Sequence, residues 1–313
     1  MSYQERSLGV LKETMTRLSR LYANTDLEPG KVHKIGLKPQ WNVVIGSTGQ
    51  CGMAINFTGI HNVSHAPGLR SSGTAEDGGA RDSRRVEFLQ SFVGKSLMEL
   101  AESSLLSGNL CIRSVGVAAL SALSQPFLVP DSLRSRGFHL QEGPGPLGDL
   151  IRVSDILTVV GYGGLVRGMH GKCKELHVTE MRPKEGFLTT IIGEEIEYGP
   201  QALFIHSDKE NEAVLGRSDL IIMTGSILVN GTFAELMAYS RRARSIGLYG
   251  PSASIIPDVL FERGVDFVMS HRIRDPARFE YDMINDIDME TALKTHQARQ
   301  VVWAVAREPK SYV

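Results

Sequence analysis

The sequence predicts an α/β fold in two domains: a small α+β domain followed by a domain built on a mostly parallel sheet. Its 313 residues exceed one typical core and favour one large or two ordinary domains. Short strands with Gly-rich turns lie in the first part of the chain. Beyond residue 149, continuous apolar runs alternate with helical segments, the pattern of a parallel sheet covered on both faces.

The first predicted domain, residues 1–148, begins with an amphipathic helix. Residues 5–23 place apolar side chains at steps of three and four. Two or three strands are expected within 31–47 and 51–59. Residues 59–84 are polar and rich in Gly, Ser and Arg, which predicts a long loop. Helical patterns return at 94–105 and at 109–124, and the latter is apolar enough to be buried.

The second predicted domain, residues 149–313, follows a Pro- and Gly-rich boundary at 142–155. Its expected strands lie within the ranges 155–161, 174–180, 201–208, 219–225, 243–250 and 265–273. Helices are expected between several of them, notably at 232–244. Residues 288–306, with valines at 301, 302 and 305, are predicted to form a C-terminal helix.

Composition excludes several classes of partner. A formal net charge of −1 gives no global field that would hold nucleic acid or an anionic membrane. No apolar run reaches the roughly 18 residues of a membrane helix, and the N-terminus has no apolar signal-peptide core. The three cysteines form no CxxC pair and no zinc spacing, so we expect a reducing cytoplasm.

Small and hydrogen-bonding residues recur where the predicted parallel strands end, which is where ligands bind in open α/β sheets. Glycine lets a ligand approach the backbone, and hydroxyl and amide side chains supply donors and acceptors. The predicted binding residues are Gly161, Thr224, Gly225, Ser226, Asn230, Thr232, Gly250, Pro251 and Ser252, with Glu180 as the predicted catalytic residue. For Asn230 and Thr232 an alternative is open: a turn followed by a helix cap, with Glu235 completing a capping box.

The Gly161 turn also suggests a nucleotide site. Glycines at 161 and 163 fit the first two positions of G-x-G-x-x-G, but Val166 stands at the third. Glu180, nineteen residues after Gly161, stands where an acidic residue would hold a ribose. The alternative is a tight strand-to-helix turn and an exposed glutamate.

Four residues are candidate ligands for a directly bound metal ion. His61 and His65 are four apart, but their surroundings are not helical, so the spacing loses its force and loop histidines are the alternative. His271 could face the sheet edge, with a surface histidine in a salt-linked turn as the alternative. Cys51 could line a cleft or be a small buried residue.

Several motifs, "VVGYGG", "TEMRP", "DLIIMTGSILVNGTFAELM" and "GLYGPSASIIPDVLFERGVDFVMSHRIRDP", occur in this order between residues 159 and 276. They resemble the putative heavy-metal chelation family, a domain of unknown function. The resemblance implies an enolase-N-terminal-like α+β domain, a Rossmann-like domain after it, and a site between the two. The chain departs from the family pattern at 59–84 and 181–217, so the family's ligand cannot be transferred directly.

These observations favour a site between the domains for a small polar ligand, such as a metal-chelating compound, with or without catalysis. Soft metals prefer thiolates and imidazoles, whereas the strand ends offer oxygens and amides. Glu180 would act there as acceptor or general base. Three alternatives are open: an enzyme using a nicotinamide or S-adenosylmethionine cofactor, a direct metal-binding protein, and a module whose 59–84 loop docks a partner. The sequence leaves homo-oligomerisation open.

Overall fold

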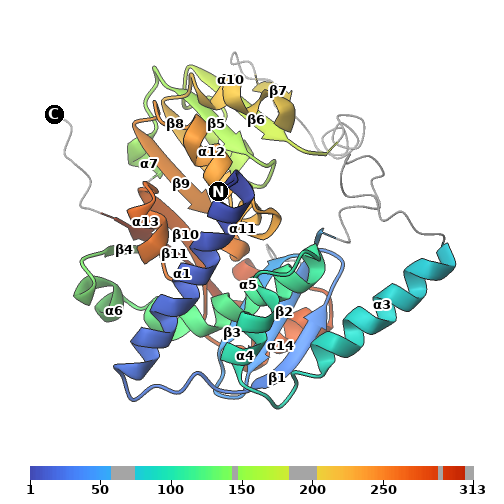
Figure 1. Cartoon of the computed structure of the whole chain (residues 1–313). Coiled ribbons are helices and arrows are strands. Elements are labelled where there is room, and N and C mark those ends of the chain that lie inside the picture. The colour runs from blue at the N-terminus through green and yellow to red at the C-terminus, as the bar shows by residue number, and fades with distance from the viewer. Residues whose placement is uncertain (58–74, 143–146, 183–202, 288–291, 307–313) are drawn as a thin grey trace.

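The chain forms two sheets, a small antiparallel one and a larger, mostly parallel one (Figure 1). The computed structural model describes residues 1–57, 75–142, 147–182, 203–287 and 292–306. A three-stranded sheet has the order β1-β2-β3, and an eight-stranded sheet has the order β4-β11-β10-β9-β8-β5-β6-β7. The predicted α/β class, with a small sheet preceding a mostly parallel one, is confirmed.

The small sheet is antiparallel, and the helix Leu110–Ser124 packs against its second and third strands. Its strands are β1 (Val32–Leu37), β2 (Trp41–Gly46) and β3 (Cys51–Ile55). The helical segments of the N-terminal part are α1 (Tyr3–Ala23), α3 (Ala75–Gln90), α4 (Leu97–Ser104), α5 (Leu110–Ser124), η1 (Gln125–Phe127) and α6 (Pro130–Ser135). The helices and strands predicted before residue 125 are therefore confirmed. The loop predicted at 59–84 lies outside the described residues up to 74, and it is wrong for 75–84, which are helical.

Helix α5 is the centre of this part. Asn109 caps it by accepting hydrogen bonds from the backbone N–H of Cys111 and Ile112 through Oδ1. The stretch Leu110–Phe127 is long and apolar enough to cross a membrane, but 83% of it is buried inside the fold. Gly52 on β3 permits the helix to approach, because a Cβ there would lie 2.1 Å from the carbonyl oxygen of Ala118.

The large sheet has six parallel strands, and two further strands, β11 and then β4, are added at one edge through antiparallel pairing. Its strands are β4 (His139–Glu142), β5 (Ile156–Val160), β6 (Glu175–Glu180), β7 (Leu203–Ser207), β8 (Leu220–Thr224), β9 (Ser245–Tyr249), β10 (Phe267–Ile273) and β11 (Arg299–Val305). Counted along the chain from β5, the parallel strands have the order 3-2-1-4-5-6 of a Rossmann fold. The strand order reverses between β5 and β8, so this fold places its crevice at their carboxyl ends.

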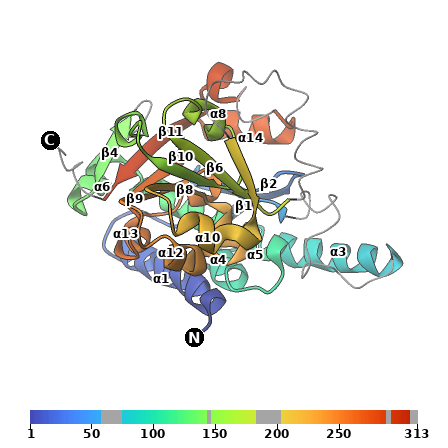
Figure 2. The same ribbon diagram turned by 90° about the horizontal axis from the view of Figure 1, so that it is seen from above.

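Both faces of the central strands β5, β6, β8, β9 and β10 are largely buried, as the continuous apolar runs predicted, whereas the edge strand β7 is partly exposed. The helical segments of this part are α7 (Leu147–Leu150), α8 (Leu165–Met169), η2 (Asp208–Glu210), α10 (Asn211–Leu215), α11 (Ser226–Asn230), α12 (Phe233–Tyr239), η3 (Pro251–Ala253), α13 (Asp258–Glu262), α14 (Pro276–Ile284) and the π-helix η4 (Ala292–His296). Figure 2 shows α1, α12 and α13 on one side of the sheet and α8 on the other. Ile221 and Met223 of β8 belong to the apolar cluster on the side of α1, α12 and α13. Leu220 and Ile222 belong to the cluster on the side of α8.

The predicted C-terminal helix at 288–306 is wrong for 299–305, whereas residues 292–296 are helical and 288–291 lie outside the described residues. Residues Arg299–Val305 form β11, which pairs antiparallel with β10 and with β4. Short apolar runs fit a buried strand and a buried helix equally well, and the β-branched and aromatic content of this one is typical of a strand. Strand β4, which belongs to the first predicted domain, joins the sheet of the second. The boundary after residue 148 stays a prediction.

Candidate functional site

The carboxyl ends of β5, β6, β8 and β9 form one edge of the large sheet, called the rim below. Gly161 follows β5 with a φ of +83°, a conformation that glycine adopts readily. A Cβ at Gly161 would stand 2.8 Å from Cγ2 of Thr224, which ends β8. The Tyr249 hydroxyl at the end of β9 donates to the Gly161 carbonyl at 2.8 Å. The structure therefore brings Gly161 and Thr224 together at the switch point.

Glu180 holds the glycine turn from the neighbouring strand. Its carboxylate accepts the backbone N–H groups of Tyr162 and Arg182, each at 3.0 Å. It also accepts Nη2 of Arg182 at 2.8 Å, and the Glu180 side chain is 7% exposed. Burial alone would raise the pKa of Glu180, but hydrogen bonds and the positive charge of Arg182, with the two backbone donors, lower it overall. Glu180 is thus ionised and already engaged near neutral pH.

Replacing Glu180 by Gln is expected to lower the free energy of unfolding by about 2 kcal/mol at pH 7, because a charged acceptor of three bonds is lost. The folded pKa of Glu180 lies below the ordinary 4.5, so its contribution is present above that pH. This contribution is lost as the pH falls through the folded pKa. The free energies of unfolding of wild type and Glu180→Gln should therefore become equal at low pH. Urea unfolding across this pH range measures the difference; equal stability at pH 7 would contradict the assigned network.

The residues after β8 and β9 pack closely against each other. A Cβ at Gly225 would lie 2.4 Å from the backbone nitrogen of Ala253, so only glycine fits there. Gly250, Pro251 and Ser252 are buried. Ser252 Oγ accepts the N–H of Ile55 at 2.9 Å, which ties the rim to β3 of the small sheet. Ser226 is partly exposed beside them.

Asn230 and Thr232 lie farther along, in the turn between α11 and α12. Asn230 Oδ1 accepts both the backbone N–H of Thr232, at 3.1 Å, and its hydroxyl, at 2.8 Å. Thr232 makes no side-chain cap bond, so the capping box predicted with Glu235 is wrong. Nη1 of the buried Arg113 on α5 donates to the adjacent carbonyl of Val229 at 3.0 Å. This geometry is that of a local turn seated on α5.

Two side chains at the rim were not singled out from the sequence. Arg182 follows Glu180 by two residues, and its side chain is 32% exposed. The paired charges in "TEMRP" at a strand end were the available signal. Tyr249 is buried, and burial raises the pKa of its hydroxyl. Its contact with the glycine turn depends on the strand order, which the sequence alone did not reveal.

Two of the four residues proposed for a directly bound metal, Cys51 and His271, lie within the described part of the chain. His61 and His65 lie outside the described residues. Cys51 is buried, and desolvation raises the pKa of its thiol to about 12. His271 is 4% exposed on β10, so the interpretation as a surface histidine is wrong. In the part of the chain that the structure describes, no group of three or more His, Cys, Asp or Glu side chains could hold a metal ion.

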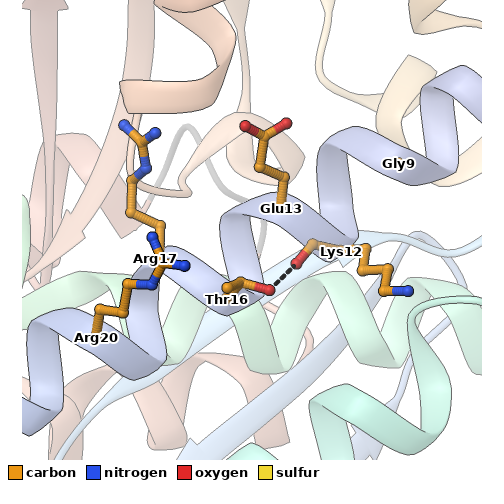
Figure 3. A pocket seen from close by; sticks show the side chains of 6 residues that line it. All are labelled: Gly9, Lys12, Glu13, Thr16, Arg17 and Arg20. Carbon is orange, nitrogen blue, oxygen red and sulfur yellow. Dashed lines mark hydrogen bonds between the residues drawn. The ribbon is translucent and has the colours of Figure 1, made fainter.

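A shallow pocket of about 340 Å³ lies on the outer side of α1, away from these residues (Figure 3). Its lining is Gly9, Lys12, Glu13, Thr16, Arg17 and Arg20. Arg17 is already paired with Glu262 of α13 at 2.7 Å. None of the predicted site residues lines this pocket, and its open, charged surface is that of an ordinary solvated helix face.

Comparison with known proteins gives a family and a fold. Two family models, both described as "Putative heavy-metal chelation", match residues 21–124 and 149–283. A Desulfitobacterium hafniense protein of unknown function is 20% identical, with a TM-score of 0.61 over 93% of this chain and 98% of its own. A Pyrococcus horikoshii protein of unknown function is 19% identical, with a TM-score of 0.63 over 95% and 98%. At these identities the likeness shows the fold alone. No curated protein matches the chain.

Proposed function

Because this chain belongs to the putative heavy-metal chelation family, we propose that it binds a small polar ligand with an anionic group at the crevice between β5 and β8. The single observation that carries the proposal is the Arg182 guanidinium, held by Glu180 beside the turn at Gly161. A guanidinium fixed in this way suits a carboxylate or phosphate. Metal-chelating metabolites commonly carry such groups, which connects the site to the family's description.

The donors and acceptors near the crevice support a small molecule over a soft metal ion. Thr224 and Ser226 are partly exposed and offer hydroxyls, and the turn at Gly161 offers a backbone that a ligand can approach. Soft metals prefer thiolates or imidazoles, and the described rim residues include neither. The buried Pro251 and Ser252 would support the crevice from below rather than contact the ligand.

Glu180 contributes chiefly as an acceptor in this proposal. Its lowered pKa makes it a weak general base near neutral pH, where catalytic bases usually need a pKa close to the working pH. Its predicted catalytic role stays a prediction. Ionised Glu180 would instead fix the orientation of Arg182, so that the guanidinium reaches the ligand without losing side-chain entropy on binding.

The alternative of a nucleotide cofactor has one observation in its favour, the Rossmann strand order. Against it, the acidic residue expected to hold a ribose already accepts three hydrogen bonds from Tyr162 and Arg182. Val166 replaces the third glycine of the fingerprint and is buried. We therefore place this alternative second.

A thermal-shift series tests the proposal. We expect citrate or another polycarboxylate chelator to raise the melting temperature of the untagged protein, and Arg182→Gln to abolish the shift. Arg182→Lys should retain part of it, because the charge remains but the planar fork is lost. Arg242→Gln, at an exposed arginine, is the matched control.

Two results would overturn the proposal. If the ligand raises the melting temperature of Arg182→Gln as much as that of wild type, the guanidinium does not bind the ligand. A shift with NAD or S-adenosylmethionine, and none with polyanionic metabolites, would favour the cofactor alternative.

The same protein preparations, run on a sizing column, test the open expectation of a homo-oligomer. We further propose a cytoplasmic location without nucleic-acid or membrane partners, in line with the net charge of −1.

A further inference from the structure

Two histidines face each other at the outer edge of the large sheet, on strands β6 and β7. Nδ1 of His177 and Nε2 of His206 are 2.9 Å apart. Nε2 of His177 lies 3.1 Å from Glu175, and Nδ1 of His206 lies 3.2 Å from Glu210. The four side chains form one row, carboxylate–imidazole–imidazole–carboxylate, that includes no residue of the rim.

The row has a consequence for where the ring protons lie. A carboxylate accepts hydrogen bonds, so each outer ring nitrogen carries its proton toward Glu175 or Glu210. A neutral imidazole has only one N–H, and both are then used. The two inner nitrogens would present their lone pairs to each other at 2.9 Å, which is favourable only with a positive centre between them. That centre is an additional proton or a metal ion, unless the guanidinium of Arg217, 3.4 Å from Nδ1 of His177, takes this place.

We propose that Nδ1 of His177 and Nε2 of His206 together bind one divalent transition-metal ion, with water in the remaining positions. Imidazole nitrogens suit Zn²⁺, Ni²⁺ and Cu²⁺. Metal-binding histidines usually donate the other ring N–H to a carboxylate, which fixes the tautomer and the ring orientation. Glu175 and Glu210 hold both rings in this way.

The two histidine rings need to move little to bind a zinc ion. With Zn–N bonds of about 2.0–2.1 Å and tetrahedral angles, the two nitrogens would stand about 3.3 Å apart. The rings must therefore separate by only a few tenths of an ångström. The His177 ring is stacked on Phe204, with centroids 4.7 Å apart, and its side chain is 1% exposed. The His206 side chain is 17% exposed and gives the ion a way in.

Arg217 competes for the same position. Its Nη2 lies 3.4 Å from Nδ1 of His177, close enough to donate to the lone pair that the metal would use. This cation must swing aside for the ion to enter, so it weakens the site. Burial, followed by the charge of Arg217, lowers the pKa of His177, although the hydrogen bond to Glu175 opposes this.

Zinc titration calorimetry on tag-free, chelator-stripped full-length protein tests the proposal. We expect one Zn²⁺ per chain with a dissociation constant in the micromolar range, and loss of this binding in both His177→Gln and His206→Gln. Glu210→Gln should weaken binding about 10-fold by releasing the ring of His206. Arg217→Met should tighten it. His33→Gln, at an exposed histidine, should leave it unchanged.

His206→Gln is the main variant to compare with wild type, because the His206 side chain is partly exposed and its replacement should leave the fold intact. Circular dichroism of each metal-free variant verifies the fold. Zinc X-ray absorption of the loaded protein should show two nitrogen ligands of imidazole type. The proposal is overturned if wild type binds no Zn²⁺, if His206→Gln binds it as tightly as wild type, or if Arg217→Met binds it more weakly. The rim test with Arg182→Gln is independent, because that variant should retain zinc binding.

Discussion

Lowering the pH from 6.5 to about 4.5 is expected to destabilise this protein by about 2 kcal/mol through one side chain, His271. Burial, with a smaller repulsion from Arg299, lowers the pKa of His271 to about 3. The unfolded chain binds a proton near pH 6.5 and the folded chain does not. A group with a lowered folded pKa stabilises the protein above its unfolded pKa, and this contribution is lost as the pH falls from 6.5 toward 3.

The surroundings of His271 explain why protonation is costly. The ring is 4% exposed on β10, and its Nδ1 has no hydrogen-bond partner among the described residues. Arg299, on the adjacent strand β11, is 3% exposed and already carries a positive charge. The backbone is fixed on both sides, since His271 N–H donates to Ser254 Oγ and Gln125 Nε2 donates to the His271 carbonyl. Moving the backbone of His271 toward water would therefore break these hydrogen bonds.

Urea unfolding of wild type and His271→Phe between pH 7 and 4.5 measures this contribution. The variant removes the titrating group and keeps an aromatic ring in the buried position. Its free energy of unfolding should fall less steeply with decreasing pH than that of wild type. His33→Phe, at an exposed histidine, should follow the wild-type slope. Parallel slopes for wild type and His271→Phe would refute the assignment.

Gly52→Ala is expected to have the largest effect of any single methyl group added to the small sheet. An ideal Cβ at Gly52 would stand 2.1 Å from the Ala118 oxygen and 2.4 Å from the Ala122 nitrogen of α5. Both are backbone atoms of a buried helix, so no side chain can turn aside. The helix and β3 must separate, and overpacking of this kind costs about 3 kcal/mol or more.

Melting temperature and urea midpoint measure the loss. Gly9→Ala is the matched control, because Gly9 lies within α1 and a Cβ there meets nothing within 4 Å. That change should stabilise the helix by about 0.5–1 kcal/mol. If Gly52→Ala unfolds at the wild-type midpoint, the close approach of α5 to β3 is wrong.

The fold was predictable where apolar periodicity is unambiguous. The helix Tyr3–Ala23 and the six parallel strands follow from local patterns, because their burial is set by residues near in sequence. The run Arg299–Val305 was assigned to the wrong class, because it becomes a strand only by pairing with β10 and β4. Such pairing is tertiary information, which a local pattern does not contain.

The candidate site was predictable in part. Gly161 and Thr224 were expected at strand ends, and the strand order brings them into contact. Asn230 and Thr232 have the same residue types but bond to each other, since local polar pairs form without any ligand. Arg182 was missed because its importance comes from Glu180 and from its 32% exposure, neither of which spacing reveals.

One packed cluster spans both predicted domains. Leu11 and Leu18 of α1, and the buried face of α5, belong to the same apolar cluster as Ile221 and Phe233 of the Rossmann part. The ion pairs Arg17–Glu262 and Arg263–Glu13 reinforce the seam from outside. A hinge that swung the two parts open would expose this shared core to water. A ligand would therefore reach the proposed site through local rearrangement of side chains rather than through domain opening. The two parts should also melt as one cooperative unit, and residues 149–313 expressed alone would present a bare apolar face and aggregate.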